Sequence, residues 1–279
     1  MSKLAAQDKF LDLSDYGRSF GKLLANSLKK TRFTPIHVTL LFGLSGLIAI
    51  GCILSKNYFF ASLFIILKSA IDAADGELAR LKNTPSYSGR YLDSVFDIVL
   101  NFMFLMTICY VSKTSFLITI LAFFCVQLQG TLYNYYYVIL RNKLVGGDTT
   151  SKVFEYKSPR ALPGESQKTV NILFKIYTLV YGIFDKIIHY LDSNAYKVKT
   201  FPNWFMTLVS IYGLGFQLLI IAVMLPMNLI QYIVPFLSFI RYLCLFLLEL
   251  EKYILKLKFT INKIDCKQLK TKHHYFNIT

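Results

Sequence analysis

Six long apolar segments constrain this chain more than any other feature of its sequence. A helix needs about 20 mostly apolar residues to cross roughly 30 Å of hydrocarbon, and each segment is close to that length or exceeds it. Of the 279 residues, 54% are hydrophobic and only 17% are charged, whereas charged residues make up about a quarter of a soluble domain. We therefore expect an all-α integral membrane protein with six transmembrane helices, at residues 37–54, 58–80, 89–111, 115–140, 204–225 and 229–250.

The positions of the basic residues predict which side of the membrane each connection faces. Of the 31 Lys and Arg residues, 27 lie in four stretches, 1–36, 79–92, 141–202 and 251–279. The connections on the other side hold only Lys56 and Lys113. Basic connections are retained in the cytoplasm during insertion, so we expect a multi-pass protein with these four stretches on the cytoplasmic side. The net charge of +15 then reflects topology and attraction to anionic lipid rather than to nucleic acid.

This pattern divides the chain into a membrane domain with cytoplasmic extensions. The membrane domain covers 37–250 and contains a cytoplasmic insertion at 141–202. A cytoplasmic N-terminal segment, 1–36, precedes the domain, and a basic cytoplasmic tail, 251–279, follows it.

Two other stretches are expected to form helices that do not cross the membrane. Residues 10–28 have apolar side chains on one side and basic ones on the other, which predicts an in-plane anchor on an anionic leaflet or a helix packed on the protein. Residues 171–191 are apolar but include Lys175, Asp185 and Lys186. We interpret them as an interfacial helix, because a span there would move the basic tail to the outside.

Four aspartates lie inside the second and third apolar segments, where charged residues are expensive and need a specific explanation. Spacings of three or four residues place Asp72 and Asp75 on one face of a helix, and Asp93 and Asp97 on one face of the next. In antiparallel helices all four carboxylates can converge on one cavity open to the cytoplasm. Their repulsion calls for cations, and hard divalent ions such as Mg²⁺ or Mn²⁺ prefer oxygen ligands.

The neighbours of these aspartates suggest a phosphate-containing substrate. Gly76 and Ala79 remove side-chain bulk from the face that carries Asp72, which leaves room for a nucleotide or a pyrophosphate. Arg80 and Arg90 flank the turn between the two segments as candidate phosphate partners.

Two other charged residues of the second segment are interpreted as structural. We interpret Lys68 mainly as an ion-pair partner of Asp72, with a wider role in balancing the carboxylates as the alternative. Glu77 is expected to be a solvated residue at the end of the helix.

These residues match the pattern D-x2-D-G-x2-A-R-x8-G-x3-D-x3-D at every fixed position over residues 72–97. The chain therefore resembles the CDP-alcohol phosphotransferase family, also called CDP-alcohol phosphatidyltransferases. The resemblance implies that Asp72, Asp75 and Asp93 ligate two divalent ions that hold the CDP pyrophosphate. It implies that Asp97 is the general base and a further metal ligand. It also assigns the cytidine and phosphate pocket to Gly76, Ala79, Arg80 and Gly89.

The resemblance implies a metal-dependent transferase of glycerophospholipid synthesis with its active site facing the cytoplasm. We expect it to move a phosphatidyl group from CDP-diacylglycerol to a small polar alcohol and to release CMP. One alternative is a CDP-choline or CDP-ethanolamine type of enzyme with diacylglycerol as acceptor, and another has a soluble acceptor such as an inositol phosphate. A different class is a cation or solute transporter. The expected partners are donor, acceptor and membrane lipid, with a homodimer as a further candidate.

Overall fold

The computed structural model describes residues 9–144, 155, 157–193, 195 and 201–239. The chain divides into two compact units, Met1–Arg241 and Tyr242–Thr279, and the basic tail falls in the second, outside the described residues. All regular elements of the described part are helical, which confirms the all-α class. The labelled elements are η2 (Leu13–Asp15), α1 (Arg18–Leu28), α2 (Pro35–Leu54), α3 (Tyr58–Leu81), α4 (Tyr87–Ser112), α5 (Phe116–Leu144), α6 (Gln167–Leu191), α7 (Asn203–Ser210) and α8 (Leu214–Met224). A further helix, which has no label, covers Ile230–Phe239.

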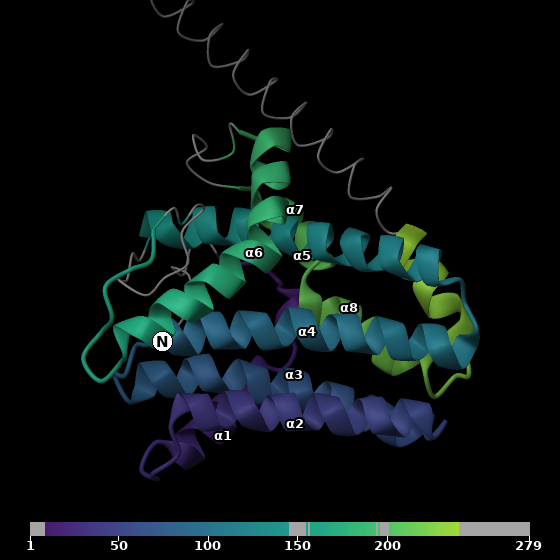
Figure 1. Cartoon of the computed structure of the whole chain (residues 1–279), viewed down its shortest axis with the longest axis horizontal. Helices are drawn as coiled ribbons and strands as arrows, with labels where there is room; N and C mark the ends of the chain where they lie inside the picture. The colour runs from purple at the N-terminus through teal and green to yellow at the C-terminus, as the bar shows by residue number, and fades with distance from the viewer. Residues whose placement is uncertain (1–8, 145–154, 156, 194, 196–200, 240–279) are drawn as a thin grey trace, which may run out of the picture. The chain divides into compact units, whose positions relative to one another are not determined.

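Helices α2, α3, α4 and α5 run alongside one another (Figure 1). The turns between them are short, and Lys56, Asn83 and Lys113 reverse the chain there with positive φ angles of 59°, 50° and 55°. The start of α2 follows from its sequence, because Thr34 and His37 form a reciprocal capping box around Pro35 in the first turn. The result is an up-and-down bundle in which α3 and α4 are antiparallel neighbours in sequence.

Three helices are long and apolar enough to cross a membrane, namely Pro35–Leu54, Tyr87–Ser112 and Phe116–Arg141, and a fourth span exists if α7 and α8 count as one. Helix α3 is not among them, because its membrane-length stretch contains Lys68, Asp72 and Asp75 together with further charges near its end. The sixth expected segment contains a helix at Ile230–Phe239, and its remainder lies outside the described residues. The structure therefore supports a helical membrane protein, and the six-span count stays a prediction.

The expected single helix at 204–225 is broken in the structure. Helices α7 and α8 meet at an angle of 49°. The N-terminal segment packs into the break, where Leu13 N donates to Ser210 Oγ at 3.0 Å and Gly215 N donates to Ser14 Oγ at 3.1 Å. A hydropathy profile could not reveal this interruption, because the polar groups that stabilise it come from the other end of the chain.

The amphipathic helix expected at 10–28 begins later than predicted. The regular helix starts at Arg18, after the short turn of η2. Gly17 and Gly21 lie against the backbone of α3, where an added Cβ would approach Ala70 and Ala73 to about 3.0 Å, so α1 is packed on the protein. Phe20 and Leu23 remain exposed on its other side, and membrane anchoring through them stays a prediction.

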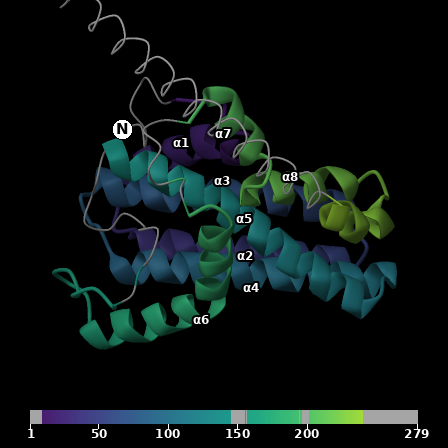
Figure 2. The ribbon, with the colours of Figure 1, turned by 90° about the horizontal axis from the view of Figure 1, so that it is seen from above.

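The stretch 171–191 is helical, as expected, and forms most of α6. This helix packs beside α4 and also contacts α5 (Figure 2). Its placement at the membrane surface remains a prediction, but its contact with α4 brings the insertion 141–202 next to the predicted site.

Candidate active site

Two antiparallel helices contribute the four aspartates, with Asp72 and Asp75 on α3 and Asp93 and Asp97 on α4. One carboxylate oxygen from each of Asp72, Asp75 and Asp93 lies within 4.8 Å of the other two. All four residues are half-buried. Three of the predicted ligands therefore converge closely enough to hold one metal ion between them.

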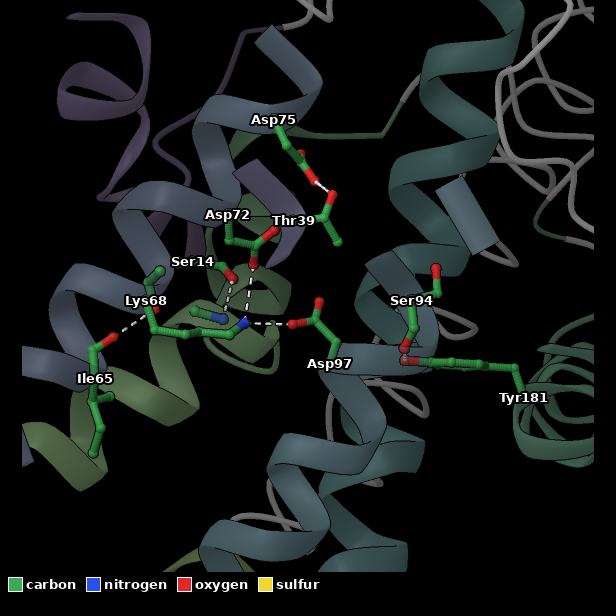
Figure 3. A network of polar contacts seen from close by, with 11 residues as sticks. Ser14, Thr39, Ile65, Lys68, Asp72, Asp75, Ser94, Asp97 and Tyr181 are labelled. Carbon is green, nitrogen blue, oxygen red and sulfur yellow. Dashed lines mark hydrogen bonds and ion pairs between the residues drawn. The ribbon is translucent and has the colours of Figure 1, made fainter. Parts of the chain in front are cut away.

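Lys68 links the fourth aspartate to this group. Its side chain is only 1% exposed, its Nζ donates to Asp72 Oδ2 at 3.1 Å, and the same ammonium pairs with the Asp97 carboxylate of α4 (Figure 3). The Nζ also lies 4.7 Å from the centre of the Phe42 ring. Lys68 is thus more than a partner of Asp72, because it offsets the charge of one carboxylate on each helix.

Helix α2 holds the second aspartate. Thr39 Oγ1 donates to Asp75 Oδ2 at 2.9 Å, and the hydrogen bond is visible in Figure 3. Thr39 is 1% exposed, so this contact is shielded from water. The hydrogen bond orients the carboxylate of this candidate ligand, as the outer partners of metal ligands commonly do.

The donor set fits a divalent cation. Asp93 Oδ1 is buried and has no hydrogen-bond partner within the described part of the chain. A buried carboxylate oxygen without a partner is costly, and a cation is a natural one for it. Lys68 brings one positive charge to four carboxylates, so the remaining charge also favours a hard cation with oxygen ligands.

The residues predicted for the CDP pocket form two groups. The guanidinium of Arg80 lies near Gly76, 3.6 Å from where a Cβ would stand, and Ala79 is on the same half-buried face of α3. Gly89 lies in the first turn of α4, where its N–H donates to the capping Ser86 Oγ at 2.8 Å. Gly89 therefore takes part in the helix cap, and its role toward a nucleotide stays a prediction.

Both arginines at the turn are paired with glutamates. Arg80 Nη2 lies 3.0 Å from Glu77 Oε1, and Arg90 Nη2 donates to Glu155 Oε2 at 2.6 Å. The expectation that Glu77 is solvated was wrong, since the residue is 3% exposed. Its pairing with Arg80 one turn later is the physical reason that it can be buried.

A cavity of about 350 Å³ lies beside the site rather than among the aspartates. It is an open cavity lined by residues of the N-terminal segment, α1 and α5, and none of the predicted site residues lines it. The lining residues are Lys9, Phe10, Asp12, Asp15, Arg18, Ser19, Lys22 and Tyr137.

The comparison with protein families decides the assignment. The model of the CDP-alcohol phosphatidyltransferase family matches residues 32–259. The chain belongs to this family. No curated protein and no solved structure matches the chain significantly. As a CDP-alcohol phosphatidyltransferase, the protein is a transferase for substituted phosphate groups that acts in phospholipid biosynthesis, and the matched region includes all four aspartates.

The sequence of this CDP-alcohol phosphatidyltransferase did not predict that residues of the insertion bind α4. The carboxylate of Glu165 accepts hydrogen bonds from Ser86 Oγ at 2.8 Å, Ser88 N at 2.7 Å and Tyr87 N at 3.2 Å. Tyr181 Oη donates to the carbonyl oxygen of Ser94 at 3.0 Å. The only sequence signal was a lone glutamate after a Pro-Gly pair, which predicts a turn and no distant partner.

Proposed function

We propose that this enzyme transfers a phosphatidyl group from CDP-diacylglycerol to a small polar alcohol and releases CMP. The observation that carries the proposal is the convergence of Asp72, Asp75 and Asp93 from two apolar helices, next to the pair formed by Lys68 and Asp97. Family membership supports phosphatidyl transfer from a CDP-alcohol, and the apolar helices alongside support a lipid-borne donor.

We assign the binding of two divalent ions, Mg²⁺ or Mn²⁺, to Asp72, Asp75 and Asp93, with Asp97 as a further ligand. Asp93 Oδ1 has no hydrogen-bond partner among the described residues, and this oxygen and the close approach of the three carboxylates support the assignment. When bound, such ions neutralise the carboxylates and stabilise negative charge on the pyrophosphate and on the transferring phosphoryl group.

Asp97 is the proposed general base. Lys68 pairs with its carboxylate and orients it, and the carboxylate accepts the proton of the acceptor hydroxyl. The hydroxyl oxygen attacks the β-phosphorus, the phosphoanhydride bond breaks, and CMP leaves with the bonding electron pair. The lysine contact also supports a division of roles, because Asp97 lies outside the group of three converging carboxylates.

The proposed CDP pocket comprises Gly76, Ala79, Arg80 and Gly89. Gly76 and Ala79 leave the backbone of α3 accessible, and Glu77 restricts the guanidinium of Arg80 beside them. This arrangement supports a role of Arg80 as a phosphate partner with a preset orientation. Arg90 is the weaker candidate because only 17% of its side chain is exposed, against 33% for Arg80.

We further propose six spans and a site that opens to the cytoplasm, with the turn between α3 and α4 in the basic stretch 79–92. The charge distribution supports this orientation, since that turn and the insertion 141–202 carry the excess of basic residues. A homodimer remains a candidate assembly.

The choice of substrates can be tested by CMP release from purified protein with Mg²⁺. CDP-diacylglycerol with a panel of small alcohols, inositol phosphate included, should release CMP, whereas CDP-choline or CDP-ethanolamine with diacylglycerol should not. The reverse result would establish the head-group type of transferase. Release of CMP from neither donor would count against both choices of substrate.

A further inference from the structure

Three residues of the insertion and of α6 contact α4 at successive turns, and we call Glu165, Glu155 and Tyr181 the brace. Glu165 binds the residues at the very start of the helix, as described above. Glu155 Oε2 accepts hydrogen bonds from Arg90 Nη2 and from Tyr91 Oη, each at 2.6 Å. Tyr181 reaches the carbonyl oxygen of Ser94 (Figure 3). At 1.5 Å per residue, these contacts cover about 12 Å of α4 and pass the level of Asp93.

Glu165 supplies partners that the first turn of α4 cannot supply for itself. The first four N–H groups of a helix have no partner within the helix, and Glu165 accepts from two of them, at Tyr87 and Ser88. The third, at Gly89, donates to Ser86 Oγ, and the Ser86 hydroxyl in turn donates to Glu165 Oε1. A carboxylate at this end also interacts favourably with the helix dipole.

The two helices of the site are therefore fixed by different parts of the chain. On α3, Asp75 is held by Thr39 of α2. On α4, Asp93 lies in the second turn after the residues that Glu165 binds, and Ser94 beside it is the residue bound by Tyr181. A small rotation or shift of α4 at its start would change the distance between Asp93 and the two carboxylates of α3, now within 4.8 Å.

We propose that Glu165 is a positioning residue that sets the distance between Asp93 and the aspartates of α3, and with it the affinity of the site for divalent ions. This inference rests on the proposed metal-binding function. It gives the insertion 141–202 a role in the reaction although Glu165 touches neither metal nor substrate.

The test uses Mn²⁺ as the probe and the purified full-length protein. Binding of Mn²⁺ is measured by electron paramagnetic resonance without substrate, and the Mg²⁺ dependence of CMP release is measured in parallel. We expect Glu165→Gln to weaken Mn²⁺ binding about tenfold, the lower end of the range for outer partners of metal sites. Glu165→Asp, which keeps the charge, should recover part of the loss.

Gln167→Ala is the matched control. Gln167 lies two residues away, and its side chain bonds Pro159 O, Ala161 N and Asn171 Oδ1, all within the insertion and the start of α6. The variant loosens the same connection without removing a contact to α4. Its Mn²⁺ affinity should stay within about twofold of the unmodified enzyme.

The outcomes separate this inference from the function on which it rests. Unchanged Mn²⁺ affinity in Glu165→Gln, or an equal loss in Gln167→Ala, would overturn the positioning role. Asp75→Asn tests the metal site itself, and unchanged Mn²⁺ binding in that variant would count against the proposed function instead. If Glu165→Gln does not fold, Tyr181→Phe removes one hydroxyl of the brace, and it must weaken Mn²⁺ binding for the inference to hold.

Discussion

The ammonium of Lys68 on α3 pairs with Asp97 on α4 while it also donates a hydrogen bond to Asp72 on its own helix. The lysine is 1% exposed and the two aspartates are half-buried, so the three charges form a largely buried cluster that links the two helices. One ammonium and two carboxylates leave this cluster with an excess of negative charge. Its stability should therefore depend strongly on the lysine and on any cation that the aspartates bind.

Replacing Lys68 with methionine should destabilise the protein by about 3–5 kcal/mol, because removal of one partner leaves buried charges without compensation. Thermal unfolding in detergent, monitored by circular dichroism, measures the effect. Added Mg²⁺ should recover part of the loss by supplying positive charge to the same carboxylates. An unfolding temperature equal to that of the unmodified protein would show that the pair with Asp97 contributes little.

The Asp97→Asn and Asp75→Asn variants should lose enzymatic activity for different reasons. Without its base, the Asp97 variant should lose at least about 100-fold in kcat and still bind CDP in a metal-dependent way. The Asp75 variant should lose that binding, because it removes a proposed metal ligand. Calorimetric titration with CDP distinguishes the two cases, and an equal loss of nucleotide binding in both would contradict the division of roles.

Thr39→Val should weaken Mg²⁺-dependent CDP binding about tenfold, because the valine cannot donate to Asp75 Oδ2. Ser45→Ala provides a matched control on the same helix. Ser45 Oγ donates to Phe64 O at 2.9 Å, so this variant also removes a hydrogen bond between α2 and α3, away from the aspartates. Similar losses of CDP binding in the two variants would point to helix packing rather than to orientation of Asp75.

The predicted topology places Lys157 and Lys113 on opposite sides of the membrane. In a cysteine-free background, an impermeant maleimide added to intact cells should label Lys113→Cys. It should label Lys157→Cys only after the cells are permeabilised. Labelling of position 157 from outside would show that the orientation is the reverse and that the site does not face the cytoplasm.

Protonation of Glu165 at acid pH should weaken its hydrogen bonds to the start of α4. Partial burial alone would raise the pKa of Glu165, but hydrogen bonds from Ser88, Ser86 and Tyr87 outweigh it and hold the pKa below its usual range. A carboxylate with a lowered folded pKa contributes stability above its unfolded pKa of about 4.3, and the contribution is lost as the pH falls through the folded value.

The unfolding temperature of the unmodified protein should therefore exceed that of Glu165→Gln by a constant amount between pH 7 and pH 5. Below about pH 4.3 the difference should shrink. A difference that is as large at pH 3 as at pH 7 would show that the glutamate stabilises the helix without its charge.

The sequence predicted the part of the site that local periodicity determines. Spacings of three and four residues place Asp72 with Asp75, and a short turn brings Asp93 opposite them, so the cluster follows from helix geometry. The same spacing logic places Lys68 one turn before Asp72. It does not show that the lysine also reaches Asp97, since that contact depends on how closely α3 and α4 pack.

Features that depend on distant partners were not predictable in this way. The break between α7 and α8 requires Ser14, and the capping of α4 requires Glu165, which follows it by more than 70 residues. In each case an apolar or turn-forming local sequence is compatible with several arrangements, and a polar contact from elsewhere selects one.

The contact of the N-terminal segment with the α7–α8 break also orders events during synthesis. Leu13 and Ser14 bind residues that lie 197 and 201 positions later in the chain. At about 5–20 residues per second, the ribosome needs about 10–40 s to make those partners after the segment has emerged. In that interval α1 and α3 are both available to pack on each other, and the two helices that carry the four aspartates have already been made. The contacts of this segment with α7 and α8 form only after both helices have been made, so a nascent chain carries its aspartates for many seconds before the N-terminal segment has all of its partners.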